Sequence, residues 1–310
     1  MFDLVDIVYV LTGMAKIMDT TTMSMPFELA QISSFVYCIT ELDPWGYNPL
    51  MFLIVGEEKV LLIDTGCDYG NLYFYVKSIP FITDKKIIVV NTHNHAEQSS
   101  GNWRFSTVGS VGLSHKVEAL YAGGRDKYYT RQLNSTYQWQ VKTYKVTHWL
   151  KERDKILLGP KESLRNVVHT FWMPGHTPDH IILHYPIDNR LFTGDIFYRF
   201  ADINFTYEFT NLKDYETSVR AILDMLKQLP AGTRYSSCKS ERDALCLPEM
   251  KHYQRFFFAV LAGTHAGIPL RIDDAEGWRF ETRDRAMRVV LSRVLVQQLE
   301  EARNGSESGG

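Results

Sequence analysis

Two histidines, His93 and His95, directly follow the apolar run KKIIVVNT, which predicts a strand buried on both faces. Residues two apart on an extended segment project to the same side, so both imidazoles can reach one ion. Neutral imidazole suits zinc, iron or manganese. Short His-x-His matches are common, so the pair indicates a metal site only if further ligand side chains converge on it.

Two later segments also pass from a predicted strand into a polar residue. FWMPGHT places His176 after a Pro-Gly turn, and RLFTGDIF places Asp195 after Thr-Gly. Functional groups concentrate in loops at strand ends. Three neutral imidazoles do not reduce the charge of a bound divalent cation, and Asp195 neutralises only one of its two positive charges. Such a cation lowers the pKa of a bound water molecule to about 7. These side chains therefore predict a metal site that makes hydroxide available at neutral pH.

Four motifs together resemble the metallo-β-lactamase superfamily. LLIDTG, THNHAEQSSGN, MPGHT and LFTGD stand in the order of that family and at roughly its spacings, over about residues 30 to 245. The resemblance implies an α/β (α+β) fold, a four-layer αββα sandwich with metals at one edge between two mixed sheets. It implies that His93, His95 and His176 hold the first metal. Asp195 would bridge to a second ion, and Asp64 would support the site through hydrogen bonds.

A second, narrower resemblance orders the candidate substrates. SHKVEAL and GDIFYRFADIN are similar to segments of the acyl-CoA thioesterase-like branch, which lies near the glyoxalase-type hydrolases. This resemblance implies a small acyl substrate: a thioester, an ester or a lactone.

The ligands of the second metal are altered in this chain. The family motif is His-x-His-x-Asp-His, and its last two positions are Glu97 and Gln98 here. Glu is one methylene longer than Asp, so Glu97 can ligate only if the backbone or the ion shifts. Gln98 is a neutral amide and a poor substitute for imidazole, so we expect it behind the ligands. Where the family has its final histidine, RYSSCKS offers Cys238, which is either a thiolate ligand or a buried structural cysteine.

Two functional hypotheses follow. The first is a metal-dependent hydrolase with one or two zinc ions, or iron or manganese, in which metal-bound hydroxide attacks an acyl carbonyl. Glu97 would act as base or orient the water, and Tyr198, three residues past Asp195, would donate to the oxyanion unless it is a packed aromatic. The second is a catalytically impaired relative that binds a ligand or a partner. His180 and His184 are expected to be structural or surface histidines.

The elements that position these residues alternate along the chain. Strands are predicted on both sides of GEE in PLMFLIVGEEKVLLIDTG and in ISSFVYCI, KKIIVVNT, SLRNVVHTFW, DHIILHYP and NRLFTGDIF. Helices are predicted near 70 to 79 and in SHKVEALYAG, YETSVRAILDMLKQL, HYQRFFFAVLAG and RAMRVVLSRVLVQQLEEA. Residues 125 to 155 lack a clean period and suggest an inserted helical or loop segment.

We therefore expect an N-terminal extension (1–27), a metallo-β-lactamase-like domain (28–246), C-terminal helices packed on it (247–303) and a disordered tail (304–310). The N-terminus is apolar, but Asp3 and Asp6 stand where a signal would be positive, and its apolar run is shorter than the roughly 20 residues that span a bilayer. No stable membrane insertion is expected.

Composition excludes several classes of partner. The 310 residues carry 34 Lys and Arg against 36 Asp and Glu, a net charge of −2, so there is no electrostatic footprint for nucleic acid. A small molecule fits better. The four cysteines are widely spaced without a Cys-x-x-Cys pair, which predicts reduced thiols and a cytoplasmic protein. The oligomeric state is left open.

Overall fold

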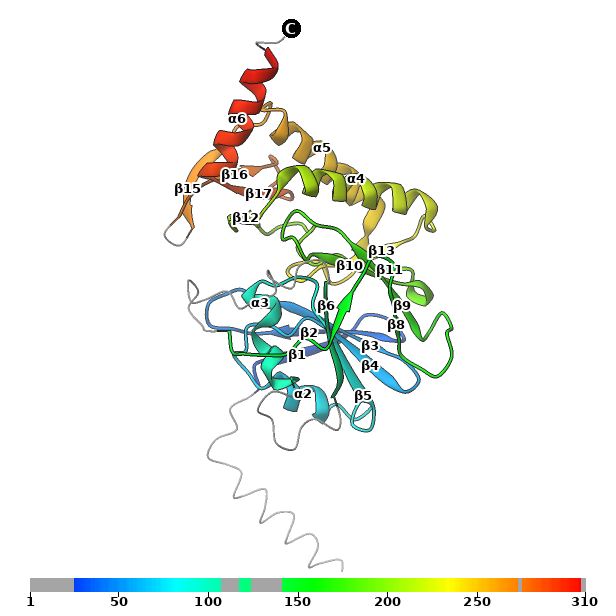
Figure 1. The fold of residues 1–310 in the computed structure, drawn as a ribbon. Helices are drawn as coiled ribbons and strands as arrows, with labels where there is room; N and C mark the ends of the chain where they lie inside the picture. Colours follow the sequence, from blue (N-terminus) through cyan, green and yellow to red (C-terminus); the bar gives the residue numbers. More distant parts are fainter. Residues whose placement is uncertain (1–24, 107–116, 124–140, 273–274, 308–310) are drawn as a thin grey trace, which may run out of the picture.

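A computed structural model describes residues 25–106, 117–123, 141–272 and 275–307 (Figure 1). Most of the predicted N-terminal extension, residues 107–116 and residues 125–140 of the predicted insertion lie outside this part. Within it, no helix is both long and apolar enough to cross a membrane.

The first sheet has the strand order β1-β2-β3-β4-β5-β6-β7. Its middle strands are continuous apolar runs, as in the fully buried LMFLIV of β3, because both faces of the sheet are covered. β4, β5, β6 and β7 run parallel, so β4 and β5 end at the same edge. The strands are β1 (Phe27–Gln31), β2 (Val36–Glu41), β3 (Leu50–Val55), β4 (Lys59–Ile63), β5 (Lys86–Val90), β6 (Val117–Gly123) and β7 (His148–Leu150).

The second sheet has the order β14-β13-β11-β10-β9-β8. It is mixed, because β11 and β13 pair parallel while β9, β10 and β11 form an antiparallel meander. Its strands are β8 (Lys155–Leu157), β9 (Val167–Trp172), β10 (Ile181–Tyr185), β11 (Arg190–Phe192), β13 (Arg234–Ser236) and β14 (Ala244–Leu245); the 3-10 turn η2 (Pro186–Asp188) joins β10 to β11.

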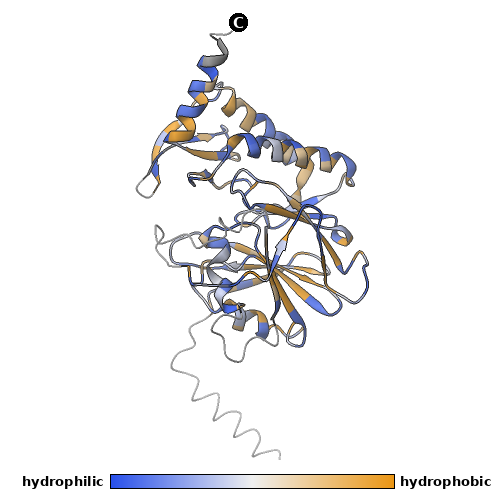
Figure 2. Ribbon diagram, in the orientation of Figure 1, coloured by the Kyte–Doolittle hydropathy of each residue, from blue (hydrophilic) through white to orange (hydrophobic). Residues whose placement is uncertain are grey.

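Three apolar clusters fill the spaces between four layers. One lies between the two sheets, a second between the first sheet and α2 (Leu72–Ser78), and a third between the second sheet and the helices α4 (Leu212–Gln228) and α5 (Cys246–Leu261). Figure 1 shows α2 on the outer face of the first sheet and α4 and α5 beyond the second, and Figure 2 shows apolar residues concentrated in the strands between them. The predicted αββα sandwich is confirmed.

Two of the predicted helices are wrong in part. Val117–Gly123 of SHKVEALYAG forms β6, which pairs with β5 and β7. In RAMRVVLSRVLVQQLEEA the helix α6 begins only at Arg293 and runs to Glu307, while Arg288–Ser292 forms β17. In both segments a short apolar run fits strand and helix equally, and pairing with other strands decides between them.

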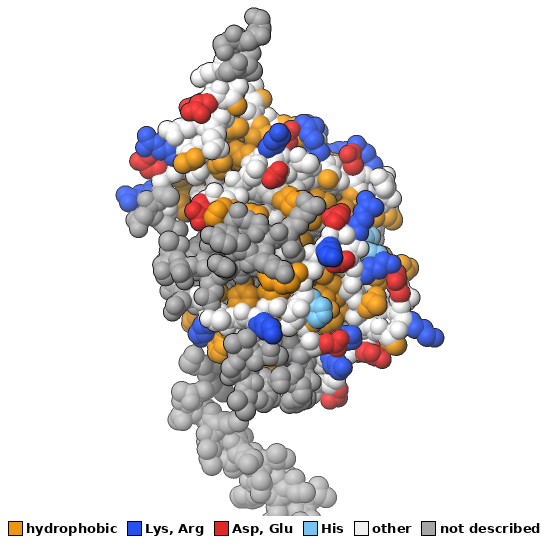
Figure 3. Space-filling view, in the orientation of Figure 1, with side chains coloured by type: hydrophobic (Ala, Val, Ile, Leu, Met, Phe, Trp, Pro, Cys, Tyr) orange, Lys and Arg blue, Asp and Glu red, His pale blue; other side chains and the backbone are white. Residues whose placement is uncertain are grey.

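The C-terminal region adds a third sheet of order β12-β17-β16-β15. Its strands are β12 (Ile203–Phe205), β15 (Ile268–Ile272), β16 (Ala275–Glu281) and β17. β12 comes soon after Asp195 and pairs parallel with β17, so this sheet is tied to the loop that follows Asp195. On the face shown in Figure 3, Lys and Arg alternate with Asp and Glu, in keeping with the near-neutral composition.

Candidate metal centre

Four side chains that are far apart in sequence meet at one edge of the two sheets. His93 and His95 follow β5, His176 follows β9, and Asp195 follows β11. All four are buried, and one potential ligand atom from each lies within 4.8 Å of the others. The spacing of the sequence motifs predicted this convergence; the role of the residues as metal ligands stays a prediction.

Neighbouring ligand atoms of this cluster lie between 3.1 and 3.5 Å apart. His95 Nδ1 lies 3.2 Å from His93 Nε2 and 3.1 Å from His176 Nε2. Asp195 Oδ2 lies 3.5 Å from His93 Nε2 and 3.4 Å from His176 Nε2. Ligands of one zinc ion with bonds of about 2.1 Å lie no more than about 4.2 Å apart, and about 3.4 Å apart in a regular tetrahedron. The four atoms, all within 4.8 Å of one another, are therefore close to the spacing at which they could share one divalent ion.

The protonation states also suit metal binding. Burial lowers the pKa of His93 and holds that of His95 well below its usual value, so both rings are neutral donors. Burial alone would raise the pKa of Asp195, but the adjacent His176 and His93 hold it well below its usual range. The cluster thus offers neutral imidazole and ionised carboxylate, the forms that bind cations.

Asp64 acts on this cluster through Thr92. Asp64 has a φ of +62°, a left-handed conformation that Asp tolerates better than most residues. Its carboxylate accepts hydrogen bonds from the Thr92 amide (2.8 Å) and hydroxyl (2.9 Å), and that hydroxyl lies 3.0 Å from His93 Nδ1. Burial raises the pKa of Asp64 to about 8, which a nearby cation would lower. With Asp64 ionised, Thr92 accepts from His93 Nδ1 and leaves Nε2 free for an ion.

Residues 45–237 match the family model of the metallo-beta-lactamase superfamily. The chain belongs to this superfamily. Among curated relatives, the human acyl-coenzyme A thioesterase MBLAC2 is 26% identical over 202 residues, which cover 58% of this chain and 69% of the relative. The probable metallo-hydrolase YybB of Bacillus subtilis (strain 168) is 24% identical over 174 residues, covering 54% and 72%.

Solved structures show the same fold. The metallo-beta-lactamase from Pontibacter korlensis has a TM-score of 0.54 at 14% identity, covering 75% of this chain and 99% of its own. VMB-1 has a TM-score of 0.55 at 17% identity, covering 77% and 100%. Both likenesses concern the fold alone.

This superfamily member has unusual side chains beside the cluster. Glu97 Oε2 is buried without a hydrogen-bond partner among the described residues, and burial raises the pKa of this carboxyl. Gln98 is buried, and its carbonyl accepts from the Thr65 amide (2.8 Å) and Asn91 Nδ2 (2.9 Å), while its side-chain Oε1 has no partner in the same part of the chain. Gln98 therefore fixes the loop after β4 through its main chain.

Cys238 lies against the far oxygen of Asp195. Its Sγ is 2.5 Å from Asp195 Oδ1, and burial together with Asp195 raises the pKa of the thiol well above its usual value. In its protonated form, the thiol donates a hydrogen bond to the Asp195 carboxylate. Neither Cys238 nor Glu97 belongs to the four-residue cluster found in the described part of the chain. Their predicted roles at a second ion stay hypotheses.

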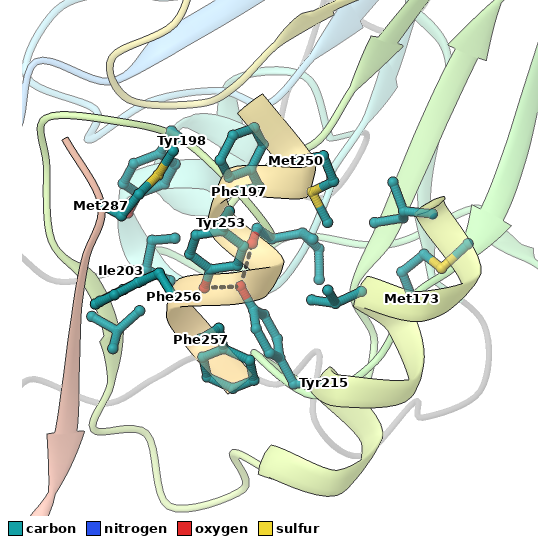
Figure 4. Packing of buried hydrophobic residues seen from close by; sticks show 14 of the residues in the cluster. Met173, Phe197, Tyr198, Ile203, Tyr215, Met250, Tyr253, Phe256, Phe257 and Met287 are labelled. Atoms are coloured by element: carbon teal, nitrogen blue, oxygen red, sulfur yellow. Dashed lines mark hydrogen bonds between the residues drawn. The ribbon is translucent and has the colours of Figure 1, made fainter. Parts of the chain in front are cut away.

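The hydroxyl of Tyr198 is engaged in the core instead of serving as the predicted oxyanion donor. Its ring is buried near Met287 in the core cluster of Figure 4, and its hydroxyl donates to the Asp202 carbonyl at 2.9 Å. This geometry favours the packed aromatic over an oxyanion donor, so the predicted catalytic role of Tyr198 is not supported. In the same cluster Tyr215 donates to the Ile196 carbonyl and contacts the Tyr253 hydroxyl, so the segment after Asp195 is held by α4 and α5.

Two further residues that were not predicted as part of the site, His180 and Tyr207, lie beside the four-residue cluster. His180 is fully buried, stacks on His93 with 4.9 Å between ring centroids, and accepts a hydrogen bond from the Asp195 amide at 3.2 Å. Its position four residues after His176 was the available signal. Tyr207 lies edge-on to His95, with 5.2 Å between centroids, and nothing in its local sequence marks it.

Proposed function

We propose that the protein is a metal-dependent hydrolase of a small acyl substrate, and that an acyl thioester is the first class to test. The observation that carries this proposal is the convergence of three buried imidazoles and one buried carboxylate at the edge between two sheets. Zinc is the ion that this nitrogen and oxygen set favours, with iron and manganese as alternatives. A zinc ion bound here would lower the pKa of a coordinated water to about 7.

The chain's own residues would orient the reaction around that ion. Thr92 fixes the His93 ring and His180 fixes the main chain of Asp195, so two of the ligands are held on their far sides. Glu97, whose Oε2 lacks a partner among the described residues, would accept a proton from the attacking water. The water oxygen then joins the acyl carbon, the carbon–sulfur bond breaks, and the leaving thiolate takes up a proton.

The relatives support the substrate class without fixing it. One is named an acyl-coenzyme A thioesterase and another a probable metallo-hydrolase. Both are about one quarter identical to this chain, so experiment must identify the acyl group and the thiol.

We also propose a cytoplasmic location, because Cys38, Cys67, Cys238 and Cys246 are free thiols. Cell fractionation would test it.

The test combines metal analysis with an acyl-substrate panel. Purified full-length protein should contain zinc and release thiol from short- and long-chain acyl thioesters, lose this activity on chelation, and regain it when zinc is added back. His176→Ala should be inactive, whereas Lys227→Met, on the exposed face of α4, should match the wild type. A chain that hydrolyses thioesters equally well with and without metal would refute the proposal.

The altered residues Glu97 and Gln98 favour one second candidate, a relative that binds a ligand without hydrolysing it. This candidate predicts that the protein binds zinc but leaves thioesters, esters and lactones intact. The same panel separates the two.

A further inference from the structure

Two histidines outside the candidate metal centre face each other across neighbouring strands. His169 on β9 and His184 on β10 are direct partners in the antiparallel register of these strands (Figure 1). Their side chains leave the sheet at adjacent points, because Cβ atoms of directly opposed residues lie about 4.5–5.5 Å apart. Leu191, which opposes His184 on β11, belongs to the cluster beneath α4 and α5, so the pair lies on the helix-facing side of the second sheet.

The pair is separate from the metal centre. His184 comes four residues after His180, which is about 13 Å along an extended segment. His169 lies in β9, seven residues before His176. Neither residue belongs to the four-residue cluster found in the described part of the chain. His169 and His184 therefore form a second group of imidazoles.

The spacing of the two rings lies within the reach of one ion. Their centroids are 6.2 Å apart, with an interplanar angle of 26°. An imidazole that binds an ion through a bond of about 2.1 Å has its centre about 3.2 Å from that ion, so two such rings lie at most about 6.4 Å apart. Both side chains are only partly buried, and rotation about their side-chain bonds can bring the nitrogens closer to a common point.

One nitrogen of the pair is buried without a partner. His184 Nε2 has no hydrogen bond to any of the described residues, and a buried polar atom in this state requires an explanation. Burial, and to a smaller extent the neighbouring His169, lower the pKa of His184 to about 4, so its ring is neutral at pH 7. Neutral imidazole is the form that binds metal ions.

The nearest cation does not leave an excess of positive charge beside the pair. Lys155 on β8 opposes His169 in the register of the sheet. Its Nζ lies 2.6 Å from Glu162 Oε1, so this lysine is neutralised locally. A divalent ion at the two imidazoles would therefore meet little repulsion from Lys155.

We propose that His169 and His184 form a second site for a divalent transition metal ion, with water completing its coordination. Imidazole ligands suit Cu²⁺, Ni²⁺ and Zn²⁺. Two protein ligands hold an ion less firmly than four, so this site should be empty after purification and fill when metal is added. A second ion per chain would then lie beneath the helices, and would not make the first centre dinuclear.

Copper titration tests this site without any assay of activity. The starting variant is His95→Ala with His176→Ala, which disables the first centre. It should bind one Cu²⁺ whose electron paramagnetic resonance spectrum shows nitrogen ligands. Adding His169→Asn or His184→Asn should remove this ion, whereas adding the control His148→Asn, an exposed histidine on β7, should not.

Two results of this titration would overturn the proposal. One is a starting variant that binds no Cu²⁺. The other is a Cu²⁺ ion with the same affinity after His169→Asn and after His184→Asn, in variants whose circular dichroism is native.

Thermal unfolding gives an independent measurement. An ion that bridges β9 and β10 binds the folded state alone and stabilises it. Added Zn²⁺ should therefore raise the unfolding temperature of the starting variant, and His169→Asn, at the more exposed member of the pair, should cancel the rise. An equal rise with and without His169 would contradict the site. Neither experiment measures hydrolysis, so both outcomes are independent of the proposed function.

Discussion

At the scale of single residues, the centre depends on groups that stand behind the ligands. The Thr92 hydroxyl joins the Asp64 carboxylate to the His93 ring. Groups in this position typically contribute 10- to 100-fold to metal affinity, on the order of 1–3 kcal/mol.

We therefore expect Thr92→Val to weaken zinc binding by about 10- to 100-fold, because His93 loses the acceptor that fixes its ring. Competition with a chromophoric chelator would measure the change. Thr217→Val is the matched control, since Thr217 lies on the exposed face of α4 and its hydroxyl donates to the Lys213 carbonyl of the same helix. Equal affinities for wild type and Thr92→Val would show that this contact does not support the site.

His95→Ala should abolish stoichiometric zinc binding, because His95 Nδ1 is the atom closest to both other imidazoles. Gln98→Ala should keep the ion, since the hydrogen bonds of Gln98 to Thr65 and Asn91 come from its main chain. Elemental analysis of the two purified variants checks both expectations. Loss of the ion from both would contradict the assignment of Gln98 as a residue behind the ligands.

The convergence of His93, His95, His176 and Asp195 could be predicted from sequence because each of them follows a recognisable strand end. His180 and Tyr198 could not be placed in this way. His180 becomes important only because β10 brings it against His93 and the Asp195 amide. Tyr198 is close to Asp195 in sequence, but the chain turns at Phe200, which has a φ of +60°. After this turn the Tyr198 hydroxyl donates to the Asp202 carbonyl.

At the scale of elements, the turn after β9 is fitted closely to the start of α4. Asn211 caps α4 by accepting from the Lys213 and Asp214 amides, and its own amide donates to the Gly175 carbonyl. Gly175 has a φ of +127°, and a Cβ there would lie 2.2 Å from the Tyr215 amide nitrogen. This contact sets the position of His176.

Gly175→Ala should therefore destabilise the fold by about 2–4 kcal/mol, since the variant combines an unfavourable φ with overlap on the α4 backbone. Urea unfolding would measure this loss. Gly232→Ala is the control, because no atom lies within 4 Å of a Cβ at that position, and its effect should stay near 0.5 kcal/mol. Similar losses in the two variants would mean that the turn can relax.

Elements with a clear period or a long apolar run were predictable, as α4 and β5 show. β6 and β17 were not, because their apolar residues suit either period and the pairing that makes them strands, with β5 for β6 and with β12 and β16 for β17, is not visible in their own residues. The third sheet was missed for the same reason. Its strands are defined by pairing with one another rather than by a periodic pattern in their own residues.

At the scale of the whole molecule, the C-terminal sheet shares the core of the family domain. Met287, Val289 and Leu291 are completely buried in the same cluster as α4 and α5. The sandwich and its C-terminal region should therefore unfold together.

Leu291→Ala should lower the free energy of unfolding by about 2–5 kcal/mol, because it opens a cavity in this common cluster. Val294→Ala, three residues later and 60% exposed, should cost less than 1 kcal/mol. Thermal unfolding followed by both circular dichroism and zinc release would show one shifted transition. Two separate transitions for Leu291→Ala would contradict a shared core.

The parallel pairing of β12 with β17 also sets an order of events during translation. Asp195 and β12 leave the ribosome well before Val289, their eventual support, has been synthesised. A nascent chain that ends just before Val289 contains every proposed ligand, but its β12 cannot yet pair with β17. Ion capture is therefore expected to follow synthesis of β17, so ribosome-stalled chains that end before Val289 should take up zinc poorly.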